Sequence, residues 1–300
     1  MDKLDIKILS RLLNNCREPD RQIGKELGIS GGAVKVRIKK MEKNKIIKQF
    51  TIKVEPLVLG LGVIYIVVSG QNIKKILKQV TLIGEPYFVV PCVGGITVCS
   101  IVVKENLQEK ILLVNKLIVN VRVLSIFEVE NIGFNSNLTK TDLEILEYLV
   151  KYPREKIDNI SKKIGFSTKT ITRCIDKLQE NNGIQFTVIY NPTKIDNYIP
   201  FAILAWINTK IENVLKQMNK ELFKSYMQIP FISKKQIVLF MYSNNVFEMD
   251  EFTQRVKNMK NVKSADLFIP KSISLPLKWL EEAIKIARKS TTLHPSYQTN

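Results

Sequence analysis

The sequence predicts an α+β protein in which one arrangement of helices and strands occurs twice. The chain has 300 residues, and 45% of them are hydrophobic, as in folded proteins with several domains. Residues 4–47 align without a gap with residues 141–184, at an offset of 137 positions. Behind each aligned segment, apolar runs with strand and helix spacing alternate in the same order. We therefore expect a duplicated module rather than an array of short repeats.

The first aligned segment predicts three helices. Leu4, Ile8 and Leu12 recur at helical spacing. A short second helix ends at Gly28, a residue type that tolerates positive φ, and Ser30 is a natural N-cap for the third helix. The inner face of the third helix is predicted to consist of Val34, Ile38 and Met41. A helix, a glycine turn and a capped helix make the helix-turn-helix pattern.

A β-rich run follows each three-helix segment, at residues 46–56 and 184–192, where the strand of a wing is expected. Each half then continues as strand, helix, strand, strand, helix, strand, the order of a ferredoxin-like domain. The predicted elements cover residues 62–70, 72–83, 87–93, 96–103, 105–119 and 121–130, and then 201–208, 211–223, 226–232, 236–242, 247–259 and 262–269. The strands are apolar on both faces, so each sheet needs a second cover. We expect a second sheet of the same kind to cover that face, either from the other half of the chain or from another chain.

These patterns divide the chain into five parts. We expect two winged helix-turn-helix domains, each followed by a ferredoxin-like domain, and a C-terminal amphipathic helix with a polar tail. The predicted boundaries are 1–55, 56–133, 134–192, 193–275 and 276–300. The last helix carries apolar residues at helical spacing, namely Trp279, Leu280, Ala283, Ile284 and Ala287. Docking on the second sheet is favoured for it over binding of a partner.

At these residues the chain resembles the Lrp/AsnC, or feast/famine, transcriptional regulators. The resemblance is carried by "LDIKIL", "IGKELGIS" and "AVKVRIKKMEKNKII" leading into "FTIKVEPLVLG", and it is weaker in the second half. It implies a DNA-binding regulator. Ordinary members have one such unit and dimerise through their sheets, so this chain would resemble a covalent dimer. The resemblance also implies a small, amino-acid-like effector near the sheets. The first half retains Gly84 and a following acid, Glu85, but the matching stretch of the second half does not, so the effector site stays unplaced.

The outward face of the third helix is the predicted DNA reader. The net charge of +18 favours a polyanionic partner, and a helix seated in the major groove of double-stranded DNA would place these cations beside both phosphate rows. The candidate DNA contacts are Ser30, Gly31, Gly32, Lys35, Arg37, Lys39, Lys40, Lys43 and Lys48. Glycines at the helix start let backbone N–H groups approach a phosphate but offer no base contact. We expect strong backbone affinity and modest base selectivity.

The second copy is a different reader. Asp176 takes the place of Lys39, and Glu180 takes the place of Lys43. The segments 1–55 and 138–190 carry net charges of about +7 and about +2. Its candidate contacts are Thr168, Lys169, Thr172 and Arg173. Acids on this face repel phosphate, so a protein-binding adaptor is one alternative for the second unit. For the whole chain, an architectural DNA-coating protein is another.

The remaining composition argues against other classes. No cysteine pair has CxxC spacing, and His294 is the only histidine, so we expect no metal, no cofactor and no enzyme. Some relatives of this fold are siroheme decarboxylases that depend on histidine, which this chain offers only in its tail. Residues 56–73 and 86–103 lack charges but are interrupted by glycine or proline. No signal peptide is apparent, and we expect a soluble cytoplasmic protein without a membrane partner. The cysteines, expected to be buried thiols, are Cys16, Cys92, Cys99 and Cys174.

Overall fold

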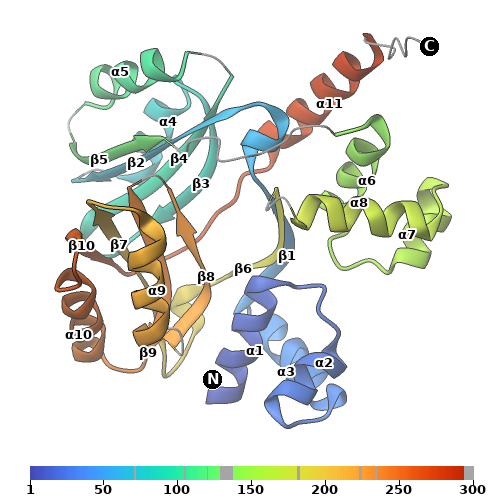
Figure 1. The fold of residues 1–300 in the computed structure, drawn as a ribbon, viewed down its shortest axis with the longest axis horizontal. Coiled ribbons are helices and arrows are strands. Elements are labelled where there is room, and N and C mark those ends of the chain that lie inside the picture. The colour runs from blue at the N-terminus through green and yellow to red at the C-terminus, as the bar shows by residue number, and fades with distance from the viewer. Residues whose placement is uncertain are drawn as a thin grey trace.

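The computed structural model describes residues 1–70, 72–104, 106–119, 121–128, 138–180, 183–222, 225–233 and 235–293. Two sheets lie together on one side of the molecule, and two helical units lie on the other (Figure 1). A two-stranded ribbon runs between the two helical units. The architecture confirms the predicted α+β class, with two helix-turn-helix units and two ferredoxin-like domains.

The two helical units have the same helix bounds, displaced by 137 residues. Both first helices begin with a capping box, formed by Asp2 with Asp5 and by Thr139 with Asp142. Both second helices end at a glycine in the left-handed conformation. The first unit consists of α1 (Lys3–Asn14), α2 (Asp20–Leu27) and α3 (Gly31–Lys43), and the second of α6 (Lys140–Lys151), α7 (Ile157–Ile164) and α8 (Thr168–Glu180). The predicted core residues of α3, namely Val34, Ile38 and Met41, are buried.

The ferredoxin-like domains have the predicted element order. The first contains β2 (Gly62–Ser69), α4 (Ile73–Val80), β3 (Glu85–Pro91), β4 (Ile96–Val103), α5 (Leu107–Leu117) and β5 (Arg122–Glu128). The second contains β7 (Ile199–Ile207), α9 (Ile211–Leu222), β8 (Tyr226–Ile232), β9 (Gln236–Ser243), α10 (Val246–Lys257) and β10 (Val262–Phe268). The sheets are antiparallel, with orders β3-β4-β2-β5 and β10-β7-β9-β8. Short 3₁₀ turns at η1 (Pro56–Leu59), η2 (Val93–Gly95) and η3 (Pro192–Lys194) complete the connections.

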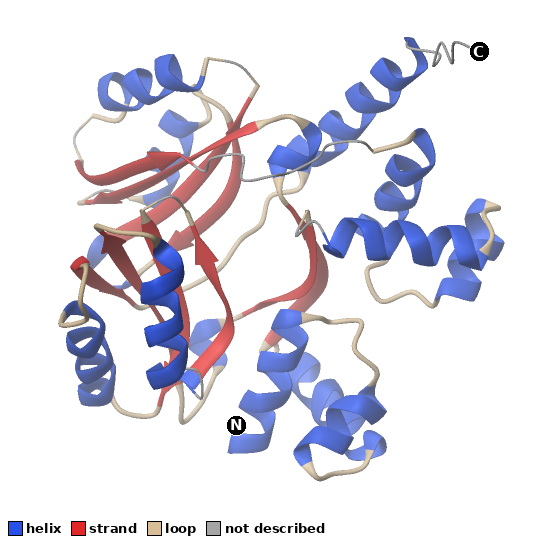
Figure 2. Ribbon diagram, in the orientation of Figure 1, coloured by secondary structure: helices blue, strands red, loops and turns tan. Residues whose placement is uncertain are grey.

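Alternate residues of β2 face two different cores, which explains why the strand is apolar throughout. Ile64 and Ile66 pack beneath α4 and α5. Tyr65 points the other way, where its ring lies 5.2 Å from the ring of Phe231 on β8. Phe127 on β5 lies 6.4 Å from Trp206 on β7. The two sheets of the chain thus cover each other, and helices lie on their outer sides (Figure 2).

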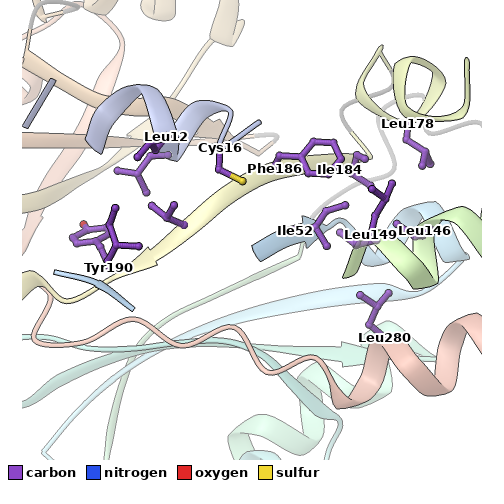
Figure 3. Close-up of a cluster of buried hydrophobic side chains, with 14 of the residues drawn as sticks. Leu12, Cys16, Ile52, Leu146, Leu149, Leu178, Ile184, Phe186, Tyr190 and Leu280 are labelled. Atoms are coloured by element: carbon purple, nitrogen blue, oxygen red, sulfur yellow. The ribbon is translucent and has the colours of Figure 1, made fainter. Parts of the chain in front are cut away.

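The strands predicted as wings form a shared ribbon instead. β1 (Ile47–Val54) and β6 (Ile184–Tyr190) pair with each other in antiparallel register, with Thr51 opposite Thr187. A strand without a neighbour leaves its backbone N–H and C=O groups unpaired, and here each strand receives its partner from the other half of the chain. Side chains from α1, α6 and α8 meet along this ribbon (Figure 3). The cluster includes Leu12, Cys16, Ile52, Leu146, Leu149, Leu178, Ile184, Phe186, Tyr190 and Leu280.

The C-terminal helix docks at a place that the sequence did not predict. After β10, the chain crosses to the first sheet, where Ser274 pairs with Val89 of β3. The helix α11 (Lys278–Leu293) then packs on β3 and α6 rather than on the second sheet, so that prediction was wrong. The Trp279 ring meets Tyr87 edge to face at 5.6 Å, and Arg288 Nη1 donates to Glu147 at 2.8 Å. The segment that leads into α11 pairs with the edge strand β3, and this pairing brings the helix to the first sheet.

Other expectations about side-chain chemistry can also be compared with the structure. All four cysteines are buried, and burial raises the pKa of Cys16, Cys99 and Cys174 to about 12 and that of Cys92 to about 11. His294 lies outside the described residues. In the described part of the chain, no group of three or more His, Cys, Asp or Glu side chains could hold a metal ion. No helix there is long and apolar enough to cross a bilayer.

Candidate nucleic-acid interface

The turn between α2 and α3 depends on two glycines at close approaches. A Cβ at Gly24 would lie 2.6 Å from the carbonyl oxygen of Ile29, and a Cβ at Gly31 would lie 3.0 Å from the Arg21 backbone. Gly28 closes α2 with a φ of 72°. The Ala33 backbone N–H donates to Ser30 Oγ at 3.1 Å, which caps α3. The local sequence therefore sets α3 tightly against α2, as in a helix-turn-helix.

Gly31 and Gly32 differ in their surroundings, although the sequence suggested one role for both. Gly31 is partly buried against α2, so its lack of a side chain serves packing. Gly32 is exposed, and the only atom within 4 Å of a Cβ placed there is Ser30 Oγ at 3.7 Å. Of the two, Gly32 is the glycine that leaves the helix start open to a ligand.

A shallow depression of about 680 Å³ surrounds this helix start. Arg21 and Lys25 of α2 line it together with Lys35 of α3, and Asp20 is its one acid. Arg21 and Lys25 were not predicted as contacts from the sequence. Their four-residue spacing, which puts both on one face of α2, was the signal that could have identified them. The residues lining the depression are Asp20, Arg21, Lys25, Ile29, Ser30, Gly31, Gly32 and Lys35.

The cations predicted for the outer face of α3 are displayed as expected. Lys35, Lys39, Lys40 and Lys43 are exposed, and Val36 between them is 67% exposed. Lys48, at the start of β1, is exposed as well. Among the described residues, no carboxylate forms an ion pair with any of these lysines. The face therefore carries a net positive charge that a phosphate row could neutralise.

Arg37 is placed differently from the lysines. Its Nη1 donates to Asp5 Oδ1 and to Asp2 Oδ2, each at 2.7 Å. These hydrogen bonds, to Asp5 first and then to Asp2, raise the pKa of the Arg37 guanidinium. The pKa of Asp2 is lowered by the backbone N–H of Asp5 and by Arg37. Arg37 thus joins α3 to the start of α1, and its charge is balanced within the domain.

The corresponding face of α8 is weaker in charge. Thr168, Lys169, Thr172 and Arg173 are all exposed, although Thr172 Oγ1 donates to the Thr168 carbonyl oxygen at 2.9 Å. Asp176 is exposed on the same helix. Lys177, in the position of Lys40, is also less available, because its Nζ lies 2.7 Å from Asp142 Oδ2.

The fold and these two helices define a protein class, namely a duplicated helix-turn-helix protein with ferredoxin-like domains. Residues 1–42 match the AsnC-type helix-turn-helix domain, and residues 138–184 match a winged helix-turn-helix DNA-binding family. The chain is 35% identical over 126 residues to the HTH-type transcriptional regulator LysM of Sulfurisphaera tokodaii. The aligned residues are 41% of this chain and 86% of that protein. The chain belongs to the Lrp/AsnC family of transcriptional regulators.

Two further similarities differ in coverage. The HTH-type transcriptional regulator Ptr1 of Methanocaldococcus jannaschii is 40% identical over 82 residues, which are 27% of this chain and 54% of that protein. The chain thus spans about half the length of this relative. The crystal structure of the siroheme decarboxylase NirDL superimposes with a TM-score of 0.49 and 12% identity, over 97% of this chain and 99% of that one. A likeness at this level carries no activity over to this chain.

Proposed function

We propose that the protein is a sequence-specific regulator of transcription that binds double-stranded DNA, with α3 as its main reader. The observation that carries this proposal is the row of exposed lysines at positions 35, 39, 40 and 43 on the third helix of a helix-turn-helix, which form no ion pair within the described residues. A solvated helix face normally mixes both charge signs, and this face has only Glu42 as an acid. The function is that of a binding protein, and no catalytic role is assigned to it.

In the proposed complex, α3 lies in the major groove. Lys35, Lys39, Lys40 and Lys43 neutralise phosphates on either side, and Lys48 reaches the backbone from β1. The open backbone at Gly32, with the positive end of α3 and the neighbouring Arg21 and Lys25, receives one further phosphate. Ser30 caps the helix and Gly31 packs it against α2. Most of the affinity then comes from the DNA backbone, so base selectivity is modest.

The second reader plays the lesser part in this proposal. Lys169 and Arg173 supply its cations, and Thr168 and Thr172 its uncharged contacts. Asp176 lies on the same exposed helix and repels phosphate. The weak charge of this face equally suits a contact with a protein partner, which is the alternative role for α8.

We further propose that the two halves of one chain pair with each other as the two subunits of a dimer would, so that the protein is a monomer. The aromatic contacts between β2 and β8, and between β5 and β7, support sheet pairing within the chain. The shared ribbon of β1 and β6 supports it as well. A light-scattering mass near the 34.5 kDa of one chain is the expected result. An amino-acid-like effector remains part of the proposal, but no residues are assigned to bind it.

The proposal is tested by genome-wide occupancy of the natural protein, followed by binding of the recovered DNA at moderate salt. Discrete promoter sites, bound about a thousandfold tighter than random DNA, are expected, which is the low end of the range for specific regulators. Equal binding of specific and random DNA over a salt titration would identify an architectural protein instead. An absence of occupancy would leave the adaptor role.

A further inference from the structure

Two arginines make reciprocal contacts between the helical units. Arg17, just after α1, lies over the Phe186 ring at 5.1 Å from its centroid. Arg154, just after α6, lies over the Phe50 ring at 4.5 Å. The two arginines are equivalent positions, 137 residues apart. Each arginine contacts the ribbon strand that belongs to the other unit. Arg17 of the first unit contacts β6, and Arg154 of the second unit contacts β1.

A hydrogen bond and an ion pair also join the two helical units. Arg17 Nη1 donates to the Pro153 carbonyl oxygen at 2.8 Å, so the first arginine touches the turn that contains the second. Arg154 Nη2 lies 3.4 Å from Asp20 Oδ1, at the start of α2. The contacts thus run from each unit to the ribbon and from one unit to the other. Asp20 also lines the depression at the start of α3, which links these contacts to the reading surface.

Guanidinium groups suit both positions. A planar guanidinium can stack on an aromatic face and still donate in its plane to a carbonyl or a carboxylate. The ribbon that joins the two units is a narrow two-stranded sheet, which can twist, and apolar side chains from α1, α6 and α8 pack along it. Contacts on both sides of the ribbon restrict that twist.

We propose that Arg17 and Arg154 form a latch that fixes the direction of α3 relative to α8. A latched pair of readers engages DNA whose two contact regions have one spacing and one phase around the duplex. This inference rests on the proposed function for its consequence on DNA, while the latch itself is a property of the free protein. Arg17 and Arg154 are positioning residues, since they act through the two reading helices.

The latch is tested first without DNA. Spin labels are attached at Lys7→Cys on α1 and Lys163→Cys on α7, two exposed positions outside the proposed DNA contacts. The native cysteines are buried with raised pKa values, so labelling is directed to the new thiols. We expect one narrow distance distribution in the otherwise natural protein and a broad one in the Arg17→Met/Arg154→Met variant. The control Arg122→Met, an exposed arginine on β5, should leave the distribution narrow.

The consequence for DNA is tested with a recovered site and the same site lengthened by about five base pairs, half a helical turn. The natural protein should bind the lengthened DNA about fivefold more weakly, because only one reader can engage it at a time. The double variant should lose this preference, with the two affinities within about threefold. Arg154→Lys, which keeps a cation over Phe50 and near Asp20, should retain part of the preference.

Each failure has a separate meaning. A broad distribution in the natural protein, or a narrow one in the folded double variant, overturns the latch whatever happens on DNA. Equal binding of the original and the lengthened DNA by the natural protein overturns the inference that the two readers require one spacing between their contact regions. A failure to bind any DNA overturns the proposed function but leaves the distance measurement valid. Should the double variant not fold, as judged by circular dichroism, Arg154→Met alone serves, since its side chain is already 32% exposed.

Discussion

Neutralising the lysines of α3 should weaken DNA binding far more than neutralising the cations of α8. The first change is the triple variant Lys35→Gln/Lys39→Gln/Lys40→Gln. All three side chains are exposed and unpaired among the described residues, so their replacement should leave the fold intact. Each phosphate contact contributes about 0.9 to the slope of log K against log salt concentration. The triple variant should therefore lose about 2.7 of this slope, and about two orders of magnitude in affinity near 0.15 M salt.

A matched pair of variants removes two cations from each reader. Lys35→Gln/Lys39→Gln should reduce the salt slope by about 1.8 and the affinity by about 30-fold. Lys169→Gln/Arg173→Gln should cost less than about fivefold, because the exposed Asp176 already keeps phosphate away from α8. Both variants carry the same change in net charge, so long-range steering is affected equally.

The assay is fluorescence anisotropy of a labelled recovered site, titrated at several salt concentrations, with thermal unfolding as the control for folding. A difference in affinity that persists while the melting temperatures agree would locate the main contact on α3. Equal losses from the two matched variants would refute the asymmetry. They would show that both readers contact the backbone to the same extent.

Three other predictions concern single substitutions. Asp176→Lys restores on α8 the charge that α3 has at its aligned position, and it should steepen the salt slope by about one and tighten DNA binding several-fold in the same titration. Gly31→Ala should destabilise by about 1–3 kcal/mol, because its Cβ would press on the α2 backbone, whereas Gly32→Ala has open space and should stabilise α3 by up to about 1 kcal/mol. Thermal unfolding distinguishes them, and equal effects would contradict the packing. The pKa of Asp142 lies below its ordinary 3.8, since hydrogen bonds from Lys177 and the N-cap outweigh the opposing effect of burial. Its contribution to stability is complete above about pH 4 and is lost as the pH falls through the lowered pKa, so Asp142→Asn should flatten the fall in melting temperature below pH 4. An unchanged pH profile in that variant would show that the carboxylate is not a source of acid sensitivity.

Local features of the sequence were sufficient for the elements and for the lysine-rich outer face of α3. The three helices of each unit have bounds that differ by the same 137 residues as the aligned sequences. Their caps depend on neighbours three residues away, so Ser30 can be identified without tertiary contacts. Helical spacing likewise separated the buried Ile38 from the exposed Lys39.

The unpredicted features all depend on contacts between distant segments. Arg37 lies on the flank of α3 by spacing alone, but its ion pair with Asp5 on α1 could not be read from that helix. The separate roles of Gly31 and Gly32 depend on how closely α2 approaches α3. The predicted wings became one ribbon because each strand found the other half as its partner.

By itself, then, the sequence determined a duplicated α+β module and a lysine-rich helix facing outward, because periodicity, caps and charge are local properties. Only the tertiary structure decided which segments became neighbours. It placed α11 on the first sheet, paired the two ribbon strands, and put Arg17 over Phe186 and Arg154 over Phe50. Many segments of a chain could pack against a given apolar face, and many side chains could contact a given arginine, with similar chemistry. The choice among them is made by shape and by the distances that the folded chain allows.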